Sequence, residues 1–141
     1  MQIPSLLARL RVAWRRYRSL GERGERAAER YLRRKGYKII ARRERGRLGE
    51  LDLIAVDGRT VVFIEVKTRS SHSAGHPAEA VDAAKQRRLT RLAVTFLKRH
   101  GLLNYPARFD VIAVIWPAGR RPKIEHFPNA FEAVGRGEFY S

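Results

Sequence analysis

The chain has 141 residues, and its 30 lysines and arginines against 14 aspartates and glutamates give a net charge of +16. That length supports one domain with a moderate core rather than two. The absence of cysteine excludes a disulfide framework, a thiolate metal site and a thiol nucleophile. The excess positive charge predicts attraction to polyanions, so nucleic acid is the first expected partner and anionic lipid is the alternative.

Residues 1–20 predict a basic amphipathic helix that precedes the main domain, because apolar residues recur at helical spacing with arginines between them. Arg9 and Arg11 interrupt the apolar run that a secretory signal requires. No run approaches the ~18–20 apolar residues of a membrane span. We therefore expect a cytoplasmic protein whose N-terminal helix packs on the domain or lies along a phosphate backbone or a membrane surface.

A flexible joint at residues 21–24 and a helix over residues 25–35 are predicted next. Ala28 and Leu32 belong to the apolar stripe of this helix, and the glycine after it is typical of a helix C-terminus. We expect the main domain to cover residues 21–131, with residues 132–141 as a tail.

A short strand is predicted over residues 37–43, and a loop rich in arginine is predicted to follow it. The arginines of this cluster are Arg42, Arg43, Arg45 and Arg47. Such a loop is suited to grip the phosphates that flank a scissile one. A solvated loop without a partner is the alternative interpretation.

Residues 49–67 predict an acidic β-hairpin, in which two runs of β-forming residues flank Asp57 and Gly58. If these two residues form the whole turn, Asp52 is a diagonal neighbour of Glu65. If the loop has four residues, Asp52 lies directly opposite Glu65. A three-residue loop would instead divide the acidic residues between the two faces of the sheet.

In either of the first two registers, one face of the hairpin carries Glu50, Asp52, Glu65 and Lys67. Three carboxylates with a single lysine are an unfavourable arrangement unless a cation is bound. Hard oxygen ligands favour Mg²⁺ or Mn²⁺, and such an ion can activate water and stabilise charge on a phosphate. A solvated face with surface ion pairs is the alternative interpretation.

Polar residues 68–77 predict a mobile loop beside this site, and we expect His72 and His76 to be loop residues rather than metal ligands. A second helix is predicted over residues 83–100, capped by Asp82. Cations oppose the helix dipole near a helix start, so their number there indicates a nearby acidic site or phosphate. The polar and basic residues concerned are Lys85, Gln86, Arg87, Arg88 and Arg91.

The last two predicted strands cover residues 109–116 and 123–127. Asp110 interrupts the apolar run of the first strand, and we prefer a structural role for it as an ion-pair partner of Arg108. The order of helix, three strands, helix and two strands predicts an α/β fold in which helices flank a mixed central sheet.

Asp52, twelve further residues and then Glu65-Val66-Lys67 resemble the D…ExK core of the PD-(D/E)XK nuclease superfamily. The blocks GELDLIA and VFIEVKTR, the Lys85-Gln86 pair and the block RFDVI resemble more closely the YraN-like family, uncharacterised protein family 0102. This resemblance covers about residues 21–131. It departs from the superfamily at Leu51, where the superfamily name gives a proline.

The resemblance implies a restriction-endonuclease-like αβββαβ core. It also implies a divalent-metal-dependent endonuclease that hydrolyses phosphodiesters of DNA or RNA, with branched or repair intermediates as candidate substrates. The implied catalytic residues are Asp52, Glu65, Lys67 and Gln86, and the expected ligands of Mg²⁺ or Mn²⁺ are Asp52, Glu65, Glu50 and Glu25. The residues expected to bind nucleic acid are Arg42, Arg43, Arg45, Arg47, Arg69, Lys85 and Arg88.

Two other functions are compatible with the sequence. The chain could bind nucleic acid without turnover, in which case binding would persist in chelator and metal would add no chemistry. It could also be an interaction protein that docks a partner or a membrane through residues 1–20. A homodimer is compatible with all three functions.

Overall fold

The computed structural model describes residues 19–71 and 81–134. The predicted N-terminal helix, His72, His76 and most of the predicted tail lie outside the described residues. The elements in chain order are α2 (Leu20–Arg34), β1 (Lys38–Gly46), β2 (Gly49–Asp57), β3 (Thr60–Arg69), α3 (Ala83–Arg99), β4 (Ala107–Ile115) and β5 (Lys123–Phe131).

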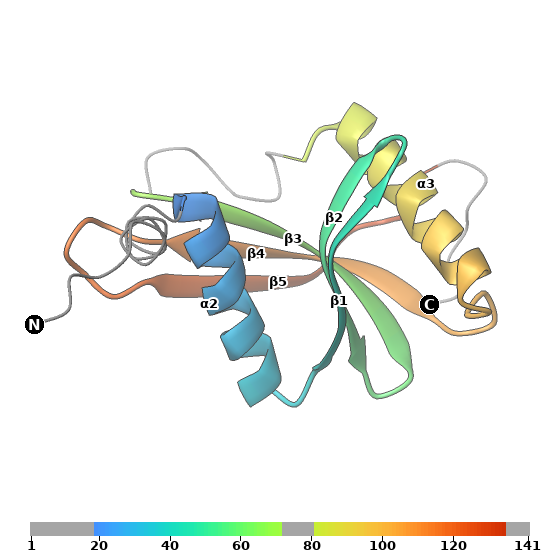
Figure 1. The fold of residues 1–141 in the computed structure, drawn as a ribbon, viewed down its shortest axis with the longest axis horizontal. Helices are drawn as coiled ribbons and strands as arrows, with labels where there is room; N and C mark the ends of the chain where they lie inside the picture. Colours follow the sequence, from blue (N-terminus) through green and yellow to red (C-terminus); the bar gives the residue numbers. More distant parts are fainter. Residues whose placement is uncertain (1–18, 72–80, 135–141) are drawn as a thin grey trace, which may run out of the picture.

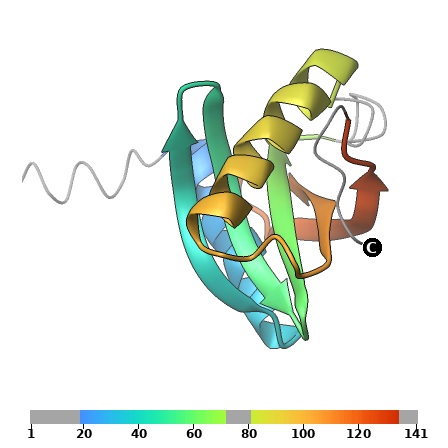
Figure 2. The same ribbon diagram turned by 90° about the vertical axis from the view of Figure 1, so that its right-hand side faces the viewer.

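The five strands form one mixed sheet in the order β1-β2-β3-β4-β5. Strands β3 and β4 are parallel, and every other neighbouring pair is antiparallel. Helix α3 makes the connection between the two parallel strands, as such a pair requires. The two helices cover opposite faces of the sheet (Figures 1 and 2). The expected fold class, α/β with a mixed sheet flanked by helices, is confirmed.

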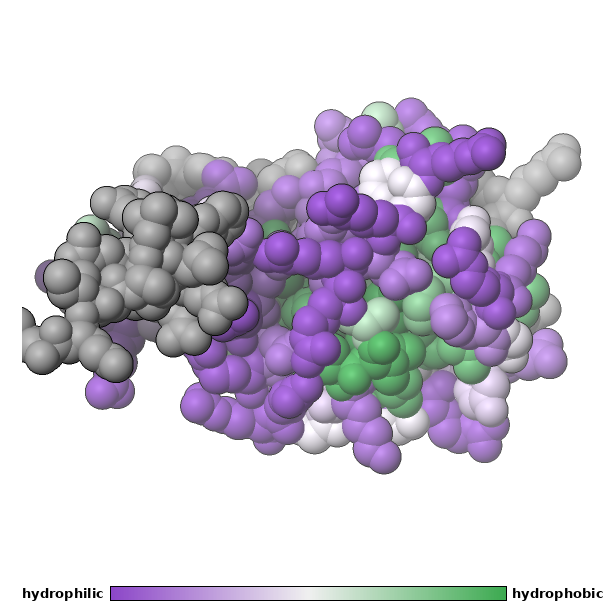
Figure 3. All heavy atoms as spheres, in the orientation of Figure 1, coloured by the Kyte–Doolittle hydropathy of each residue, from purple (hydrophilic) through white to green (hydrophobic). Residues whose placement is uncertain are grey.

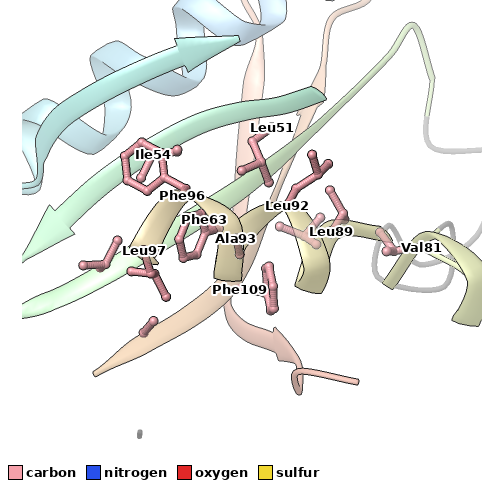
Figure 4. Close-up of a cluster of buried hydrophobic side chains, with 13 residues drawn as sticks. Leu51, Ile54, Phe63, Val81, Leu89, Leu92, Ala93, Phe96, Leu97 and Phe109 are labelled. Atoms are coloured by element: carbon pink, nitrogen blue, oxygen red, sulfur yellow. The ribbon is translucent and has the colours of Figure 1, made fainter. Parts of the chain in front are cut away.

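Each helix packs against the sheet over a separate hydrophobic core. The core under α3 contains Leu92 and Phe96 of the helix with Phe63 of β3 (Figure 4). The core under α2 contains Leu32 of the helix with Ile64 of β3. Neighbouring residues of β3 enter different cores because side chains alternate along a strand, so this central strand is buried on both sides.

Helix α2 begins five residues earlier than the sequence predicted, so the proposed flexible joint at residues 21–24 is wrong. The Ser19 hydroxyl caps the helix by accepting a hydrogen bond from the Glu22 amide at 3.2 Å. Gly24 is buried, and a Cβ atom placed on it would lie 1.8 Å from Oγ1 of Thr68 on β3. The glycine therefore serves close helix–strand packing and does not break the helix.

Strand β1 is longer than the predicted residues 37–43, and it contains most of the arginine cluster that was predicted to be a loop. Its pairing with β2 continues to Gly46↔Gly49, so the connecting turn is short. The register shifts between Ile39 and Ala41, and Arg43 has a φ of +47°, which is uncommon for a residue other than glycine. These irregularities bend the edge strand.

The β2–β3 hairpin has the register in which Val56 pairs with Val61, one of the two that the sequence allowed. The pairing includes Asp57↔Thr60, so the two turn residues are Gly58 and Arg59 rather than Asp57 and Gly58. Gly58 has a φ of +62°, a conformation that tight hairpin turns require and glycine adopts without strain.

Asp110 has the structural role that the sequence predicted. Its fully buried carboxylate accepts hydrogen bonds from Arg108 Nε at 3.0 Å and from the Asn129 amide at 2.9 Å, and it lies 2.7 Å from Nε2 of His126. Burial opposes ionisation, but the bonds with His126 and Arg108 outweigh it and hold the pKa of Asp110 below its ordinary value. Strand β5 runs to Phe131, beyond the predicted end at residue 127.

Hydrophilic side chains dominate the face shown in Figure 3, with an apolar area over the region where β1 crosses the sheet. Ile40 of β1 is 45% exposed. Neither described helix has the length and apolar character needed to cross a membrane.

We expect Gly24→Ala to destabilise the protein, although alanine is favoured over glycine in a helix by ~1 kcal/mol. The added methyl group would collide with Thr68, and overpacking of this kind costs about 1–3 kcal/mol. Chemical denaturation measures the change. Gly21→Ala is the matched control in the same helix, because its nearest neighbour, Ser19 Oγ, is 3.9 Å away. Equal effects of the two substitutions would show that the close approach at Gly24 is not a packing constraint.

Candidate active site

The candidate site lies where β2 and β3 separate, a place we call the strand fork. Their pairing ends at Leu53↔Ile64. Beyond it β2 continues beside β1 to Gly49, and β3 continues beside β4 to Arg69 (Figure 1). Asp52 and Glu65 are the first residues past the last pair, one on each strand. The register predicts that they face each other across the opening.

Asp52 bridges the strand fork from the β2 side. One of its carboxylate oxygens, Oδ2, accepts a hydrogen bond from the Val66 amide of β3 at 2.9 Å. On either side of it, Leu51 packs in the α3 core and Leu53 in the α2 core. Residues two apart on a regular strand share one face, so the alternation of side chains along β2 is interrupted at Asp52. A cavity of about 620 Å³ between α2 and β1 reaches Asp52.

Glu65 lies on the β3 side of the fork and is only 7% exposed. Its Oε1 atom accepts a hydrogen bond from Lys85 Nζ of α3 at 2.5 Å and lies 3.2 Å from Lys67 Nζ. Two lysines from different elements thus share one carboxylate oxygen, which keeps a buried negative charge paired.

The proximity of these groups changes their proton affinities. Burial, and then repulsion from Glu65, raise the pKa of Asp52 to about 7. Burial, and then the hydrogen bond with Lys85, lower the pKa of Lys67 below its ordinary value. Burial also disfavours the charged form of Lys85, but its bonds to Glu65 and Lys67 outweigh this and raise its pKa. Of the two lysines, Lys67 therefore gives up its proton more readily.

The other two carboxylates predicted as metal ligands are engaged by arginines of β1. Glu25 of α2 accepts a hydrogen bond from Arg43 at 3.0 Å, and Glu50 accepts one from Arg45 at 3.1 Å. Glu25 nevertheless lines the cavity that reaches Asp52, and its charge contributes to the raised pKa of Asp52.

Three of the four clustered arginines have acidic partners. Besides the pairs of Arg43 and Arg45, Arg42 Nε donates to Glu29 of α2. Arg47, in the β1–β2 turn, has no side-chain partner among residues 19–71 and 81–134. The cluster is therefore largely neutralised by α2 and β2, and phosphate binding there would have to compete with these ion pairs.

The remaining predicted residues, Gln86, Arg88 and Arg69, make no hydrogen bond or ion pair with Asp52 or Glu65 within the described part of the chain. The Gln86 side chain donates to the Val81 carbonyl at 2.8 Å and so fixes the chain that leads into α3. Arg88 is exposed on α3. Arg69, at the end of β3, has a buried Nε atom without a hydrogen-bond partner in the described part of the chain.

The donor atoms at the strand fork suit a hard divalent cation. Asp52 and Glu65 supply carboxylate oxygens, and repulsion from Glu65 adds to burial in raising the pKa of Asp52. Among residues 19–71 and 81–134, no three acidic or histidine side chains converge as a complete ligand cage. Mg²⁺ fits such an incomplete set, because it commonly binds one or two carboxylates and completes its shell with water and substrate phosphates.

The sequence missed the direct contact between Lys85 and Glu65. The residues held a signal for it, since a lysine in the first turn of α3 opposes the helix dipole and requires a compensating negative charge. Asp82 supplies only the helix cap, by accepting from the Lys85 amide at 2.8 Å. The carboxylate that balances the side chain is on β3, which only the tertiary structure reveals.

The pKa of Asp52 predicts how stability depends on pH without metal. The unfolded chain loses this proton near pH 3.8 and the folded protein near pH 7, so Asp52 progressively destabilises the fold as pH rises between these values. Asp52→Asn should therefore raise the melting temperature in chelator, slightly near pH 4 and most above pH 7. Thermal melts across this range measure the difference. The control is Glu125→Gln, whose 35% exposed carboxylate faces Lys123 on β5. An increase in the melting temperature of Asp52→Asn that does not depend on pH would contradict the raised pKa of Asp52.

Comparison with known proteins places the chain in a family. The model of the uncharacterised protein family UPF0102 matches residues 24–114. A UPF0102 protein of Rhodopirellula baltica is 52% identical over 86% of this chain and 75% of its own length. Relatives from Geobacter metallireducens and Alkaliphilus metalliredigens are each 50% identical, over 82% and 81% of this chain and 93% and 98% of their own lengths. The chain therefore belongs to the uncharacterised protein family UPF0102.

Proposed function

We propose that the protein is a divalent-metal-dependent phosphodiesterase that acts on DNA or RNA. The observation that carries this proposal is the meeting of Asp52 and Glu65 at the strand fork, with Lys67 and Lys85 on the second carboxylate. The net charge of +16 supports a polyanionic substrate. The resemblance of Asp52, Glu65 and Lys67 to the D…ExK core supports the same reaction.

Asp52 and Glu65 would hold Mg²⁺ or Mn²⁺ at the fork. Such an ion, when bound, supplies an acidified water and stabilises charge on the phosphate. Because a metal ligand must be ionised, Asp52 would have to release its proton on metal binding at pH values near or below 7.

Lys67 and Lys85 would have different roles in the reaction. Lys67 has the lowered pKa, so its Nζ atom is suited to accept a proton from the attacking water. Lys85 has the raised pKa, so its Nζ atom stays charged and is suited to stabilise negative charge that develops on the phosphate. Glu65 holds both amines in place through one oxygen.

A second candidate function is nucleic-acid binding without turnover. It is favoured by the ion pair between Lys85 and Glu65, which occupies one of the two carboxylates, and by the absence of a third converging ligand in the described residues. The two functions differ in a cleavage screen on labelled duplex, single-stranded and branched substrates with Mg²⁺, Mn²⁺ or chelator.

For the nuclease, Glu65→Ala and Asp52→Asn should each reduce metal-dependent cleavage at least ~100-fold, because each removes a metal ligand. Their affinity for nucleic acid in chelator should be equal or improved, since a carboxylate that repels phosphate has been removed. Cleavage gels and fluorescence anisotropy measure the two quantities. Glu125→Gln is the control. Full activity in Glu65→Ala would refute the site, and no cleavage by the wild type with binding intact would favour the second candidate.

The two lysines should be separable. Lys67→Ala should abolish turnover but retain Mn²⁺ binding in calorimetry, because lysine is not a ligand, whereas Glu65→Ala should lose the binding. Lys85→Ala removes a neighbour that lowers the pKa of Lys67, so its pH–rate profile should move to higher pH. An unshifted profile would show that Lys67 is not the group that takes the proton. Equal Mn²⁺ binding by the wild type and both Lys67→Ala and Glu65→Ala would move the metal away from the fork.

A further inference from the structure

A second cavity, of about 440 Å³, lies on the α3 side of the sheet, between that helix and the β1–β2 turn. We call it the turn groove. Its floor is apolar and is made by Leu51, Leu92 and Phe96, which Figure 4 shows between α3 and the strands. Leu48 of the β1–β2 turn also lines the groove. Leu48 is 37% exposed. A volume in the range of about 300–1,000 Å³ is that of a site for a small ligand or for part of a larger one.

The rim of the turn groove is strongly basic. It carries Arg45, Arg47, Arg91 and Arg99, and the only acidic residue in its lining is Glu44. The side chains of Arg45 and Arg99 are 82% and 63% exposed although each is near a carboxylate. Arg47 and Arg91 are exposed and have no side-chain partner in the described part of the chain. An apolar floor inside a ring of arginines suits a ligand with an apolar face and several negative charges.

The turn groove and the candidate active site share two elements, β2 and α3. Leu51 of its floor directly precedes Asp52, and α3 carries Lys85 together with two of the groove arginines, Arg91 and Arg99. At a rise of 1.5 Å per residue, Arg91 lies about 9 Å and Arg99 about 21 Å along the helix from Lys85. A strand whose phosphate is at the strand fork could thus reach the groove with its neighbouring nucleotides.

We propose that the turn groove binds unpaired nucleotides of the substrate strand, next to the phosphate that is cleaved. In a duplex the bases are stacked and paired, so a duplex would offer this groove only its phosphates. An unpaired nucleotide places a base face on the apolar floor and its phosphates against the arginines, the two features by which single strands are bound. The inference extends the proposed function, because it assigns single-stranded or branched nucleic acid as the substrate class.

Close approach of the turn to α3 is built into the sequence. A Cβ atom on Gly46 would lie 2.7 Å from Cδ2 of Leu92, so a larger residue there would require the Leu92 side chain to move. Gly49, at the start of β2, has a φ of +137°, which other residues rarely adopt. The shape of the groove therefore depends on backbone positions that glycine occupies.

The test is direct binding in chelator, where turnover cannot interfere. Labelled single-stranded DNA, single-stranded RNA and a blunt duplex are titrated with the full chain and with Arg47→Ala/Arg91→Ala. The double variant should bind single strands at least ~10-fold more weakly and the duplex less than about threefold more weakly. Its log–log salt slope on single strands should fall by about 1.4, because each lost phosphate contact contributes ~0.7. Since neither side chain has a described partner, the variant should fold normally.

Two further variants make the result specific. Arg120→Ala/Arg121→Ala removes the same charge from the β4–β5 connection, where both residues are exposed, and should change single-strand affinity much less. Leu48→Ser should weaken single-strand binding roughly fivefold without changing the salt slope, since a base contact carries no charge. Equal losses in the two double-arginine variants, or equal losses on duplex and single strand, would overturn the groove as a single-strand site.

The outcome is distinguishable from that of the proposed nuclease activity. Loss of single-strand affinity in Arg47→Ala/Arg91→Ala supports the groove even if the wild type cleaves nothing. Cleavage that is normal in this variant on both single-stranded and branched substrates overturns the groove and leaves the nuclease intact. A labelled peptide of alternating glutamate and leucine is the protein-like competitor. If it binds the wild type more tightly than the single strands do, the groove is a protein-docking surface and the inference is wrong.

Discussion

The hydrogen bond from the Val66 amide to Asp52 is the contact on which the candidate site depends. An antiparallel pair would ordinarily satisfy a strand amide with a carbonyl of its neighbour. Here the regular pairing has ended at Leu53↔Ile64, and a carboxylate replaces the carbonyl. This bond lets β2 separate from β3 without leaving the part-buried Val66 amide unpaired, and it holds an acidic group near Glu65. Separation of the strands and convergence of the two carboxylates are thus one structural event.

Charge pairing determines which parts of a very basic protein remain available to ligands. Helix α2 presents Glu22, Glu25 and Glu29 to Arg42 and Arg43, so the face between α2 and β1 is largely neutralised. On the α3 side, by contrast, Arg45 and Arg99 pair with Glu50 and Glu44, whereas Arg47 and Arg91 have no side-chain partner in the described part of the chain. The sequence has its arginines spread over both regions, yet the fold leaves uncompensated charge mainly on one side. The uneven distribution of positive charge over the surface therefore follows from the positions of the acidic residues.

The sequence was sufficient for the order of elements and the cap at Asp82, and it narrowed the hairpin to two registers, because these follow from local periodicity and turn chemistry. It was insufficient wherever the role of a residue depends on a contact with a residue distant in the sequence. Gly24 suggested a flexible joint, because the residue that requires a glycine there, Thr68, is on strand β3. The pairing of Arg43 with Glu25 and of Lys85 with Glu65 depends on where the helices lie against the sheet. Spacing along the chain does not contain that information.

The irregular outer strands have a consequence for self-association. Strand β1 has a register shift after Ile39 and a positive φ at Arg43. Strand β5 contains Pro128, which has no amide hydrogen, and Asn129, with a φ of +50°. Regular edges invite another chain to add a strand, and features of this kind prevent it. Both edges are therefore poor templates for an added strand, which disfavours fibril-like growth of the sheet.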